Sequence, residues 1–299
     1  MTPETAAFLD EISALPPVPA GDAASARTRR RYLASRFDSG PASVTTIDES
    51  LGRVRVRSYH PSLERSDLVI VYVHGGGWIA GDVDTHDGTC RRLAASSGLE
   101  VVSVDYRRPP EHVHPAAVRD VLEVVIARGG EHVVLAGDSA GAHVAVEVAL
   151  ELRSTRVIDA LVLIQPANDP RANSASWQRY ATGYFLTAAA MAWYWSSYVP
   201  AGSSISALSD RDLRGLPRCY ILTSSLDPSQ DDGVRLAQAL READVPAVHE
   251  HVIGVPHGCF TLPRAFPSVQ GSIDRAAAWA ANESPPPLDT VSTPGKSKG

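Results

Sequence analysis

Short runs of apolar residues alternate along the chain with longer segments whose apolar residues recur at helical spacing. We expect the apolar runs to form buried strands, at residues 68–73, 101–104, 132–136, 160–164, 219–223 and 247–253. Between and after them we expect helices, at residues 87–97, 116–128, 140–152, 232–243 and 268–281. This alternation predicts an α/β fold with a mostly parallel central sheet flanked by helices, in which ligands bind at the carboxyl ends of the strands.

Two segments precede this alternation. Residues 1–40 have a helical pattern that is interrupted at Leu15–Pro19, so we expect an N-terminal helical cap segment. Residues 44–48 and 53–59 alternate between apolar and polar side chains on either side of a Leu-Gly pair. This pattern is typical of an antiparallel hairpin.

The main domain is expected to span residues 41–283. Its rhythm of strands and helices breaks at an insert of about residues 166–206, which holds many of the aromatic residues of a chain that is only 6% aromatic. Such an insert is either a small satellite core or a helical lid over an apolar pocket. Residues 284–299 are rich in proline and polar residues, which predicts a disordered tail.

Charge and cysteine content exclude several classes of protein. The net charge is −6 and the longest basic block is Arg29–Arg31, so we expect no nucleic-acid partner, and we place this block on the exposed face of an N-terminal helix. Cys90, Cys219 and Cys259 are too few and too far apart for a disulfide framework or a zinc site. The sequence has no pattern of a secretory signal and no apolar stretch near the ~20 residues that span a bilayer. We therefore expect a cytoplasmic protein without a membrane span.

Candidate chemistry begins at Ser139, in a Gly-x-Ser-x-Gly pattern between a predicted strand and a predicted helix. A serine on such a strained turn needs small neighbours, and Gly137 and Gly141 provide them. The pattern alone also fits an ordinary turn with a solvated serine. The flanking strand and helix favour a nucleophile held at the carboxyl edge of the sheet.

A serine nucleophile needs a base, and the base needs a partner that fixes its tautomer. The expected chain order on this fold is Ser, then Asp or Glu, then His. Asp227 and His257 each follow a predicted strand, so both lie on loops at the edge that carries Ser139. His249 and His251 fall inside a strand and are interpreted as surface or core residues. The carboxylates of residues 231–232 start a helix, where the helix dipole favours them, and we assign them a structural role.

The segment Val73–Trp78 contains three consecutive glycines directly after a buried strand. Glycines there allow the backbone to approach a ligand and to direct N–H groups inward, as in the oxyanion hole of esterases. We predict that this loop forms such a hole with the Ala140 N–H as a further donor, and that His74 orders the loop by hydrogen bonding. A phosphate-binding role is disfavoured because no Gly-Lys-Ser/Thr follows. No metal or organic cofactor is implied.

Taken together, these motifs resemble the hormone-sensitive-lipase family of α/β-hydrolases. They keep the family's order over roughly residues 65–280, and they are His74–Trp78, Asp105–Arg107, Pro110–His112, Pro115–Ala117, Gly137–Gly141, Asp227–Pro228 with Asp231 and Gly233, and His257–Gly258. The resemblance implies an α/β-hydrolase fold and a catalytic triad of Ser139, Asp227 and His257. It also implies an oxyanion hole from Gly75, Gly76 and Ala140, and a lid formed by the N-terminal segment and the insert.

Several positions depart from the family's pattern, and they concern the substrate pocket. The departures are Arg108–Pro109 before Pro-Glu, His114 before Pro-Ala-Ala, Ala142–His143 after the serine motif, Ser229 after Asp-Pro, and Cys259 after His-Gly. Arg108 and His114 could meet a polar substrate, while surface drift explains them equally well. We expect the pocket to include these two residues together with Trp78, Tyr184 and Phe185.

The resemblance implies a serine hydrolase that cleaves a short, acetyl-like acyl group from a small molecule by way of an acyl-enzyme. An alternative is an N-deacetylase of a secondary metabolite such as a peptide antibiotic intermediate, because some bacterial family members have that activity. Two readings from other classes are a lyase or dehydratase and a small-molecule receptor on the same fold. The expected partner is an acylated small molecule, and family members often form homodimers.

Overall fold

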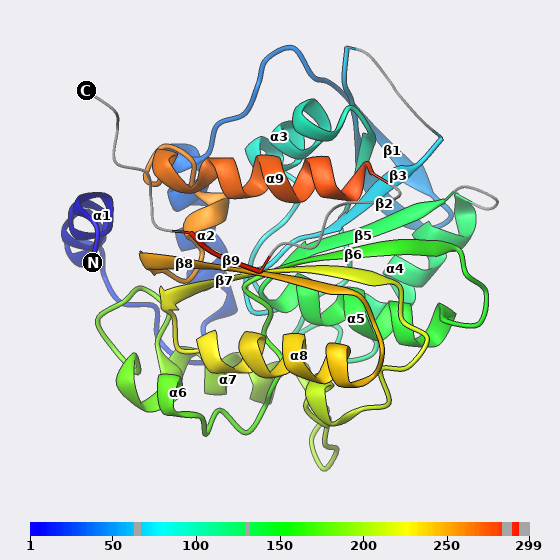
Figure 1. The fold of residues 1–299 in the computed structure, drawn as a ribbon. Helices are drawn as coiled ribbons and strands as arrows, with labels where there is room; N and C mark the ends of the chain where they lie inside the picture. Colours follow the sequence, from blue (N-terminus) through cyan, green and yellow to red (C-terminus); the bar gives the residue numbers. More distant parts are fainter. Residues whose placement is uncertain (63–66, 129–131, 283–288, 293–299) are drawn as a thin grey trace.

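A central sheet of nine strands organises the molecule in the computed structural model, which describes residues 1–62, 67–128, 132–282 and 289–292 (Figure 1). The strands occur in the order β1-β2-β4-β3-β5-β6-β7-β8-β9. Their bounds are Thr45–Leu51 (β1), Val54–His60 (β2), Val69–Val73 (β3), Glu100–Val104 (β4), Val133–Asp138 (β5), Ile158–Ile164 (β6), Arg218–Leu226 (β7), Ala247–Pro256 (β8) and Asp289–Ser292 (β9). β2 is antiparallel to both β1 and β4, and the other neighbouring pairs are parallel. The predicted α/β class and mostly parallel sheet are confirmed.

Helices cover both faces of this sheet, as Figure 1 shows. One face carries α3 (Asp87–Ser97) and α9 (Gln270–Ala280), and the other carries α4 (Ala116–Ala127), α5 (Ala140–Leu152) and α8 (Gln230–Glu242). Because both faces are covered, the inner strands are buried on both sides, and every residue of β3 and β5 is buried. This explains why these strands are continuous apolar runs rather than alternating patterns.

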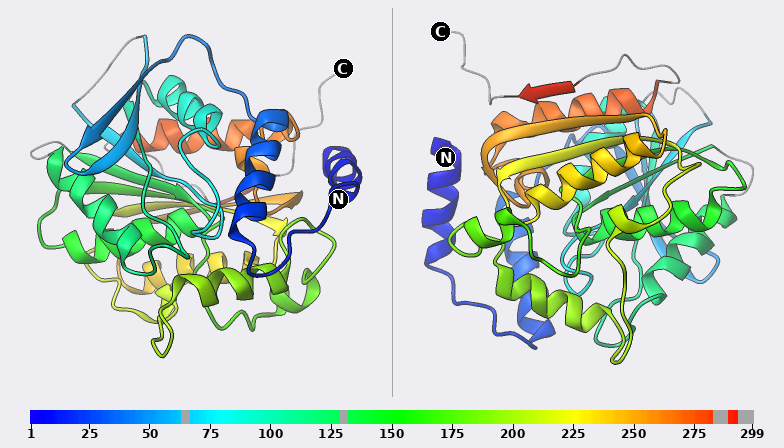
Figure 2. Two further views of the ribbon diagram at one scale, coloured as in Figure 1. Left: turned by 180° about the vertical axis from the view of Figure 1, so that it is seen from behind. Right: turned by 60° about the horizontal axis from the view of Figure 1, so that its bottom comes forward.

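The N-terminal cap, which we define as residues 1–40, contains two helices, α1 (Pro3–Ser13) and α2 (Ala23–Phe37). They lie at the end of the sheet toward which the parallel strands run (Figure 2). Thr2 caps α1 by accepting from the Thr5 N–H, and the backbone N–H of Thr2 and the hydroxyl of Thr5 both donate to Gly254 O in β8. The Phe8 ring of α1 packs edge-on against Phe37 and Phe266, with centroids 5.5 and 5.1 Å apart.

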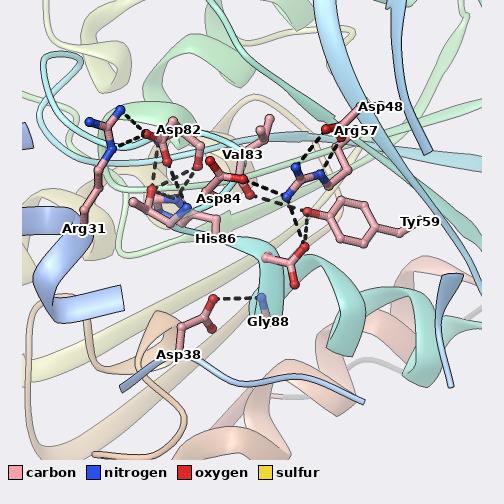
Figure 3. A network of polar contacts seen from close by, with 12 residues as sticks. Arg31, Asp38, Asp48, Arg57, Tyr59, Asp82, Val83, Asp84, His86 and Gly88 are labelled. Carbon is pink, nitrogen blue, oxygen red and sulfur yellow. Dashed lines mark hydrogen bonds and ion pairs between the residues drawn. The ribbon is translucent and has the colours of Figure 1, made fainter. Parts of the chain in front are cut away.

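Charged side chains fasten α2 to the segment that leads into α3, as Figure 3 shows. Arg31 donates to Asp82 at 3.0 Å, and the Asp38 carboxylate, just after α2, accepts from the Gly88 N–H at 2.8 Å. Next to this contact, Arg57 of β2 pairs with both Asp48 and Asp84. α2 is therefore held against the loop between β3 and α3 along its length.

The insert contains α6 (Ala175–Arg179) and α7 (Ala188–Tyr198). Both helices are attached to the main domain through buried polar groups. The Trp177 indole N–H donates to Asp232 Oδ2 at 2.8 Å, and the Tyr198 hydroxyl donates to Glu147 at 3.2 Å. The predicted structural role of Asp232 agrees with this contact, since its carboxylate anchors α6 to α8.

The environment of Asp232 makes the stability of the protein depend on pH. Burial raises the pKa of Asp232 to about 6, although the hydrogen bonds from Trp177 and Arg235 act in the opposite direction. A raised carboxyl pKa favours the protonated form in the folded state, so the stabilising contribution is present below the unfolded pKa and is lost as pH rises through about 6. An Asp232→Asn variant lacks this titration. We expect its Tm to rise relative to the natural protein between about pH 5 and about pH 8. Thermal unfolding at both pH values measures this, and a constant Tm difference would contradict it.

The tail predicted to be disordered is described only in part. Residues 284–288 and 293–299 lie outside the described residues, whereas residues 289–292 form β9, paired in parallel with β8 from His249 to Val252. This is a correction for residues 289–292: the edge of β8 offers unpaired backbone groups, and the backbone of this segment pairs with them. Within the described ranges, no helix has the length and apolar character needed to cross a membrane.

Candidate active site

Ser139 lies in the sharp turn between β5 and α5. Its φ of 53° is unusual for a residue with a side chain, and this strain is offset by backbone bonds: the Ser139 N–H donates to Ile164 O at 2.8 Å, and Ser139 O accepts from the Ala167 N–H at 3.1 Å. The turn directs the hydroxyl towards His257, with Oγ 2.9 Å from Nε2.

His257 and Asp227 reach Ser139 from the ends of β8 and β7, which lie beyond β6 in the sheet. His257 follows β8 and Asp227 follows β7, so the carboxyl ends of parallel strands bring the three side chains to one edge. His257 Nδ1 lies 2.8 Å from Asp227 Oδ2. The other oxygen of Asp227 accepts from both the N–H and the hydroxyl of Ser229, each at 2.8 Å, which fixes the carboxylate in the plane that the imidazole needs. The structure thus brings together all three residues that the sequence predicted.

Close packing explains the glycines that flank Ser139. A Cβ atom on Gly141 would lie 1.9 Å from Val73 O, and one on Gly137 would lie 2.7 Å from both Val73 O and the Gly141 carbonyl carbon. The first turn of α5 therefore rests directly on the end of β3. This contact sets the serine beside the loop that follows β3.

The loop after β3 differs in one respect from the prediction. The Gly75 N–H donates to Asp138 Oδ1 at 2.8 Å, so it is not available to a substrate, and the prediction that Gly75 supplies an oxyanion donor is corrected. Gly76 and Gly77 instead line the cavity together with Ser139. Both have positive φ, 108° and 60°, and a Cβ on Gly76 would lie 2.1 Å from Ala80 O. Gly77 therefore lies at the cavity, where Gly75 was expected.

Asp138 is the residue that orders this loop. Its Oδ1 accepts from the Tyr72 hydroxyl at 2.7 Å as well as from the Gly75 N–H. Burial alone would raise its pKa, but His86, Arg30 and the Tyr72 hydroxyl together hold the pKa of Asp138 well below its usual range. A carboxylate that is ionised at neutral pH therefore fixes the backbone between β3 and the cavity. Sequence reasoning missed this role, although Asp138 stands next to the serine.

His74 orders the same loop from its other side, as predicted. Its Nδ1 lies 3.0 Å from Gly75 O, its ring stacks on Tyr106 at 4.2 Å, and its backbone O accepts from the Tyr106 hydroxyl. Burial, the neighbouring His86 and the charge of Arg108 hold the pKa of His74 well below its usual range. His74 is thus a neutral, buried imidazole that supports the loop, and it is unsuited to act as the general base.

A cavity of about 530 Å³ opens above Ser139 and His257. Its walls come mainly from the N-terminal cap and the insert, both of which are distant from Ser139 in sequence. The residues that sequence reasoning did not place there include Ile12, Leu15, Arg29, Arg30, Leu33, Met191 and Tyr194. The aromatic insert forms no separate satellite core, because Trp195 and Tyr198 are buried in one cluster with residues of the central strands. Tyr194, on the same helix, lines the cavity.

Of the five residues expected to line the pocket, Phe185 does so, and the other four lie elsewhere. Trp78 is fully buried and stacks on Tyr198 at 4.3 Å. Arg108 donates to Gly81 O and Asp105, and His114 lies 3.3 Å from the buried carboxylate of Glu147. Tyr184 packs edge-on against Tyr180. These four side chains were expected at the pocket because of their polarity or size, but each is occupied by a partner within the protein.

The basic block of α2 also differs from its prediction. Arg31 is exposed, with 66% of its side chain accessible, but Arg29 and Arg30 line the cavity. The signal for this was in the sequence. Ala26 and Leu33 are buried and lie four residues before and three residues after Arg30, so all three share one face of the helix.

The described residues contain no group of three or more His, Cys, Asp or Glu side chains that could hold a metal ion. The polar groups at the cavity that suit chemistry are instead a hydroxyl, an imidazole and backbone N–H donors. These are the components of acyl transfer through a serine.

Comparison with known proteins agrees with this geometry. A family model described as the alpha/beta hydrolase fold matches residues 70–261. The carboxylic ester hydrolase LipN of Mycobacterium tuberculosis is 30% identical over 270 residues, covering 81% of this chain and 71% of the relative. An ethyl acetate hydrolase of Pseudomonas putida is 31% identical and covers 72% of this chain and 73% of its own length.

Among solved structures, an ester hydrolase from the metagenome of Lake Arreo, crystallised with a phosphonate derivative, superposes with a TM-score of 0.84 at 33% identity. The match covers 94% of this chain and 98% of that one. The order of the motifs, the sheet and these relatives agree, and the chain belongs to the hormone-sensitive-lipase-like family of α/β-hydrolases.

Proposed function

We propose that the protein is a serine esterase that removes short, acetyl-like acyl groups from small-molecule esters. The observation that carries the proposal is the chain of hydrogen bonds from Ser139 through His257 to Asp227, which opens on a cavity beside Gly76 and Gly77. The names of the relatives, a carboxylic ester hydrolase and an ethyl acetate hydrolase, support the same reaction and a small acyl group.

In the first half of the proposed reaction, His257 Nε2 takes the proton of Ser139 as Oγ attacks the ester carbonyl carbon. Negative charge develops on the carbonyl oxygen, and the N–H groups of Gly76, Gly77 and Ala140 donate to it. Each such donor lowers the barrier by about 3 kcal/mol. The protonated imidazole then donates its proton to the departing alcohol oxygen as the ester C–O bond breaks, which leaves the acyl group on Ser139.

In the second half, water enters the position of the alcohol and His257 removes its proton. The resulting hydroxide attacks the acyl carbon, the bond to Ser139 Oγ breaks, and the serine recovers its proton from His257. Asp227 holds the Nδ1–H of the imidazole throughout, and it stabilises the imidazolium in both halves. Ser229 supports this by fixing the carboxylate.

Steady-state hydrolysis of a matched pair tests the proposal: an acetyl ester of a small alcohol, and the N-acetyl amide of the corresponding amine. We expect the ester to be hydrolysed much faster than the amide, because an alcohol leaves more readily than an amine. Equal turnover of the amide would favour an N-deacetylase of a secondary metabolite. If neither is hydrolysed and an alkyl phosphonate fails to label Ser139, the esterase proposal is wrong, and a ligand-binding receptor becomes the better reading.

Three further points belong to the proposal. The N-terminal cap and the insert form the lid, which is supported by the walls that they contribute to the cavity. A cytoplasmic location is supported by the cysteines, which are three buried free thiols and suit a reducing compartment. A homodimer stays a prediction, and sedimentation of the purified protein tests it.

A further inference from the structure

Two guanidinium groups from α2, those of Arg29 and Arg30, line the cavity that holds Ser139 and His257. Both residues are half-buried. The other side chains that the cap and the insert contribute to the cavity wall are largely apolar, so the two guanidinium groups are exceptions among them. Cations inside an apolar cavity require an explanation, because removing a charge from water is unfavourable unless an opposite charge compensates it.

Neighbouring arginines of the same helix each have a carboxylate partner. Arg27 pairs with Glu111, Arg31 with Asp82 and Arg36 with Glu11, at 2.7, 3.0 and 2.7 Å. Among the described residues, no carboxylate lies within ion-pair distance of the other two arginines of the helix. α2 thus separates its arginines into paired ones outside and unpaired ones at the cavity.

The two unpaired arginines contact a backbone carbonyl, an imidazole and a hydroxyl. Arg29 Nη1 donates to Pro16 O at 2.8 Å, and burial lowers the pKa of Arg29. Arg30 Nη2 lies 2.9 Å from His86 Nε2 and 3.2 Å from Thr261 Oγ1, and its Nε is buried with no hydrogen-bond partner among the described residues. Both side chains are therefore held in place, and among the described residues no hydrogen bond uses Arg29 Nη2 or Arg30 Nη1, which remain for a ligand.

Tyr194 locates these charges relative to the reaction. A Cβ on Gly77 would lie 2.3 Å from the Tyr194 ring, so the ring rests on the proposed oxyanion loop. Burial raises the pKa of Tyr194, and the charges of Arg30 and then Arg29 act on it in the opposite direction. Both guanidinium groups are thus close enough to Tyr194 to influence its hydroxyl. The two arginines therefore line the same cavity as the aromatic side chain that covers Gly77.

The charge at the cavity favours a monoanion. The ionised carboxylate of Asp138 also lines the cavity, so two positive charges face one negative charge there, although the whole chain carries −6. A planar carboxylate matches the fork of a guanidinium with two parallel hydrogen bonds. A single carboxylate would balance the charge and use the unpaired donors.

We propose that Arg29 and Arg30 form an anion subsite that selects esters carrying a carboxylate, an inference that rests on the proposed esterase function for the position of the ester group. The carboxylate comes from either of two sources. It belongs to the acyl part, as in a monoester of a dicarboxylic acid, or to the alcohol part, as in an acetylated hydroxy acid.

Two pairs of substrates distinguish these sources. Monoethyl succinate is compared with ethyl 4-oxopentanoate for the acyl side, and 4-acetoxybutanoate with 4-acetoxybutanamide for the alcohol side. We expect the natural protein to favour the carboxylate member of one pair in kcat/KM by about 10- to 100-fold, the range of a charge-assisted hydrogen bond. In Arg29→Gln and Arg30→Gln this ratio is expected to fall at least about tenfold. Each variant's turnover of the neutral ester is the internal reference for correct folding.

Arg36→Gln is the matched control, because Arg36 lies on the same helix, is exposed and pairs with Glu11. The ratio is expected to be retained in this variant. If the natural protein hydrolyses the neutral esters but shows no preference for either carboxylate, or if the preference survives in both cavity variants, the anion subsite is wrong and the esterase proposal stands.

A binding measurement separates the subsite from catalysis. Calorimetric titration of Ser139→Ala with the same esters is expected to show about 10- to 100-fold tighter binding of the preferred carboxylate ester. The difference should disappear in the double variants that also carry Arg29→Gln or Arg30→Gln. Preferential binding without any hydrolysis by the natural protein would support the subsite and overturn the esterase proposal. Equal affinity for both members of each pair overturns the subsite.

Discussion

Replacing Ser139 with alanine is expected to lower kcat/KM for a short-chain acetyl ester by about 10⁵- to 10⁶-fold. The hydroxyl is the only group in the arrangement that forms a covalent bond with the acyl carbon, and His257 then has no proton to accept from it. The residual rate comes from the oxyanion donors and from binding alone. Steady-state assays with an acetyl ester, together with mass spectrometry after treatment with an alkyl phosphonate, measure the effect.

Ser196→Ala is a suitable control, since Ser196 is exposed on α7 and, among the residues that the structure describes, its hydroxyl bonds only to Trp193 O. It should retain full turnover and full labelling of Ser139. A Ser139→Ala protein that keeps a tenth of the natural rate would place the nucleophile elsewhere. Product formation that survives without an acyl-enzyme would instead favour the lyase reading.

Replacing Gly141 with alanine is expected to destabilise the protein by about 3 kcal/mol or more. The added Cβ would lie 1.9 Å from Val73 O and 2.6 Å from His74 O. These are backbone atoms of β3 and of the loop that follows it, so no side-chain rotation can relieve the overlap. α5 or β3 must move, and the hydroxyl of Ser139 moves with α5. Denaturant unfolding measures the loss, and activity should fall together with stability.

Gly271→Ala is the matched control for this substitution. Gly271 is the second residue of α9, as Gly141 is of α5, but its Cβ would meet only the end of the Arg275 side chain at 3.4 Å. The free energy of unfolding should therefore change by less than about 1 kcal/mol. An equal loss in both variants would show that the close contact with β3 is not the reason for Gly141.

The fold was predictable because its signals are local. The buried strands β3 and β5 are continuous apolar runs, and α5 follows a glycine-bounded turn, so each can be recognised within about ten residues. Asp227 and His257 could be selected because each directly follows a strand, and parallel strands end at one edge of the sheet. Chain order and topology were therefore enough to predict which three residues form the proposed triad.

The oxyanion loop shows what such reasoning lacks. Three neighbouring glycines are equivalent in sequence, and the choice among them depends on which N–H is already bonded. Gly75 is excluded by Asp138, which is 63 residues away along the chain but adjacent in space. Only the register of β3 with β5, in which Val73 pairs with Gly137, brings the carboxylate to that N–H.

The pocket was predicted least well, for a related reason. Its walls come from the N-terminal cap and the insert, whose positions depend on tertiary contacts such as Phe8 with Phe266 and Trp78 with Tyr198. The polarity of a side chain did not indicate whether it lines the cavity. Arg108 and His114 are polar departures from the family pattern with partners inside the protein, whereas Arg29 and Arg30 had seemed an ordinary exposed basic block.

The attachment of α1 to β8 has a consequence for how the protein is made. Thr5 leaves the ribosome early, but its hydrogen-bond partner Gly254 is 249 residues further along the chain. At about 5–20 residues per second, the partner is synthesised roughly 10–50 s later. The first helix of the nascent chain therefore waits for nearly the last strand of the main domain. The cavity above Ser139 is completed only when α1 docks on β8. The newly made enzyme therefore forms the turn that carries Ser139 well before it forms the cavity walls that select a substrate.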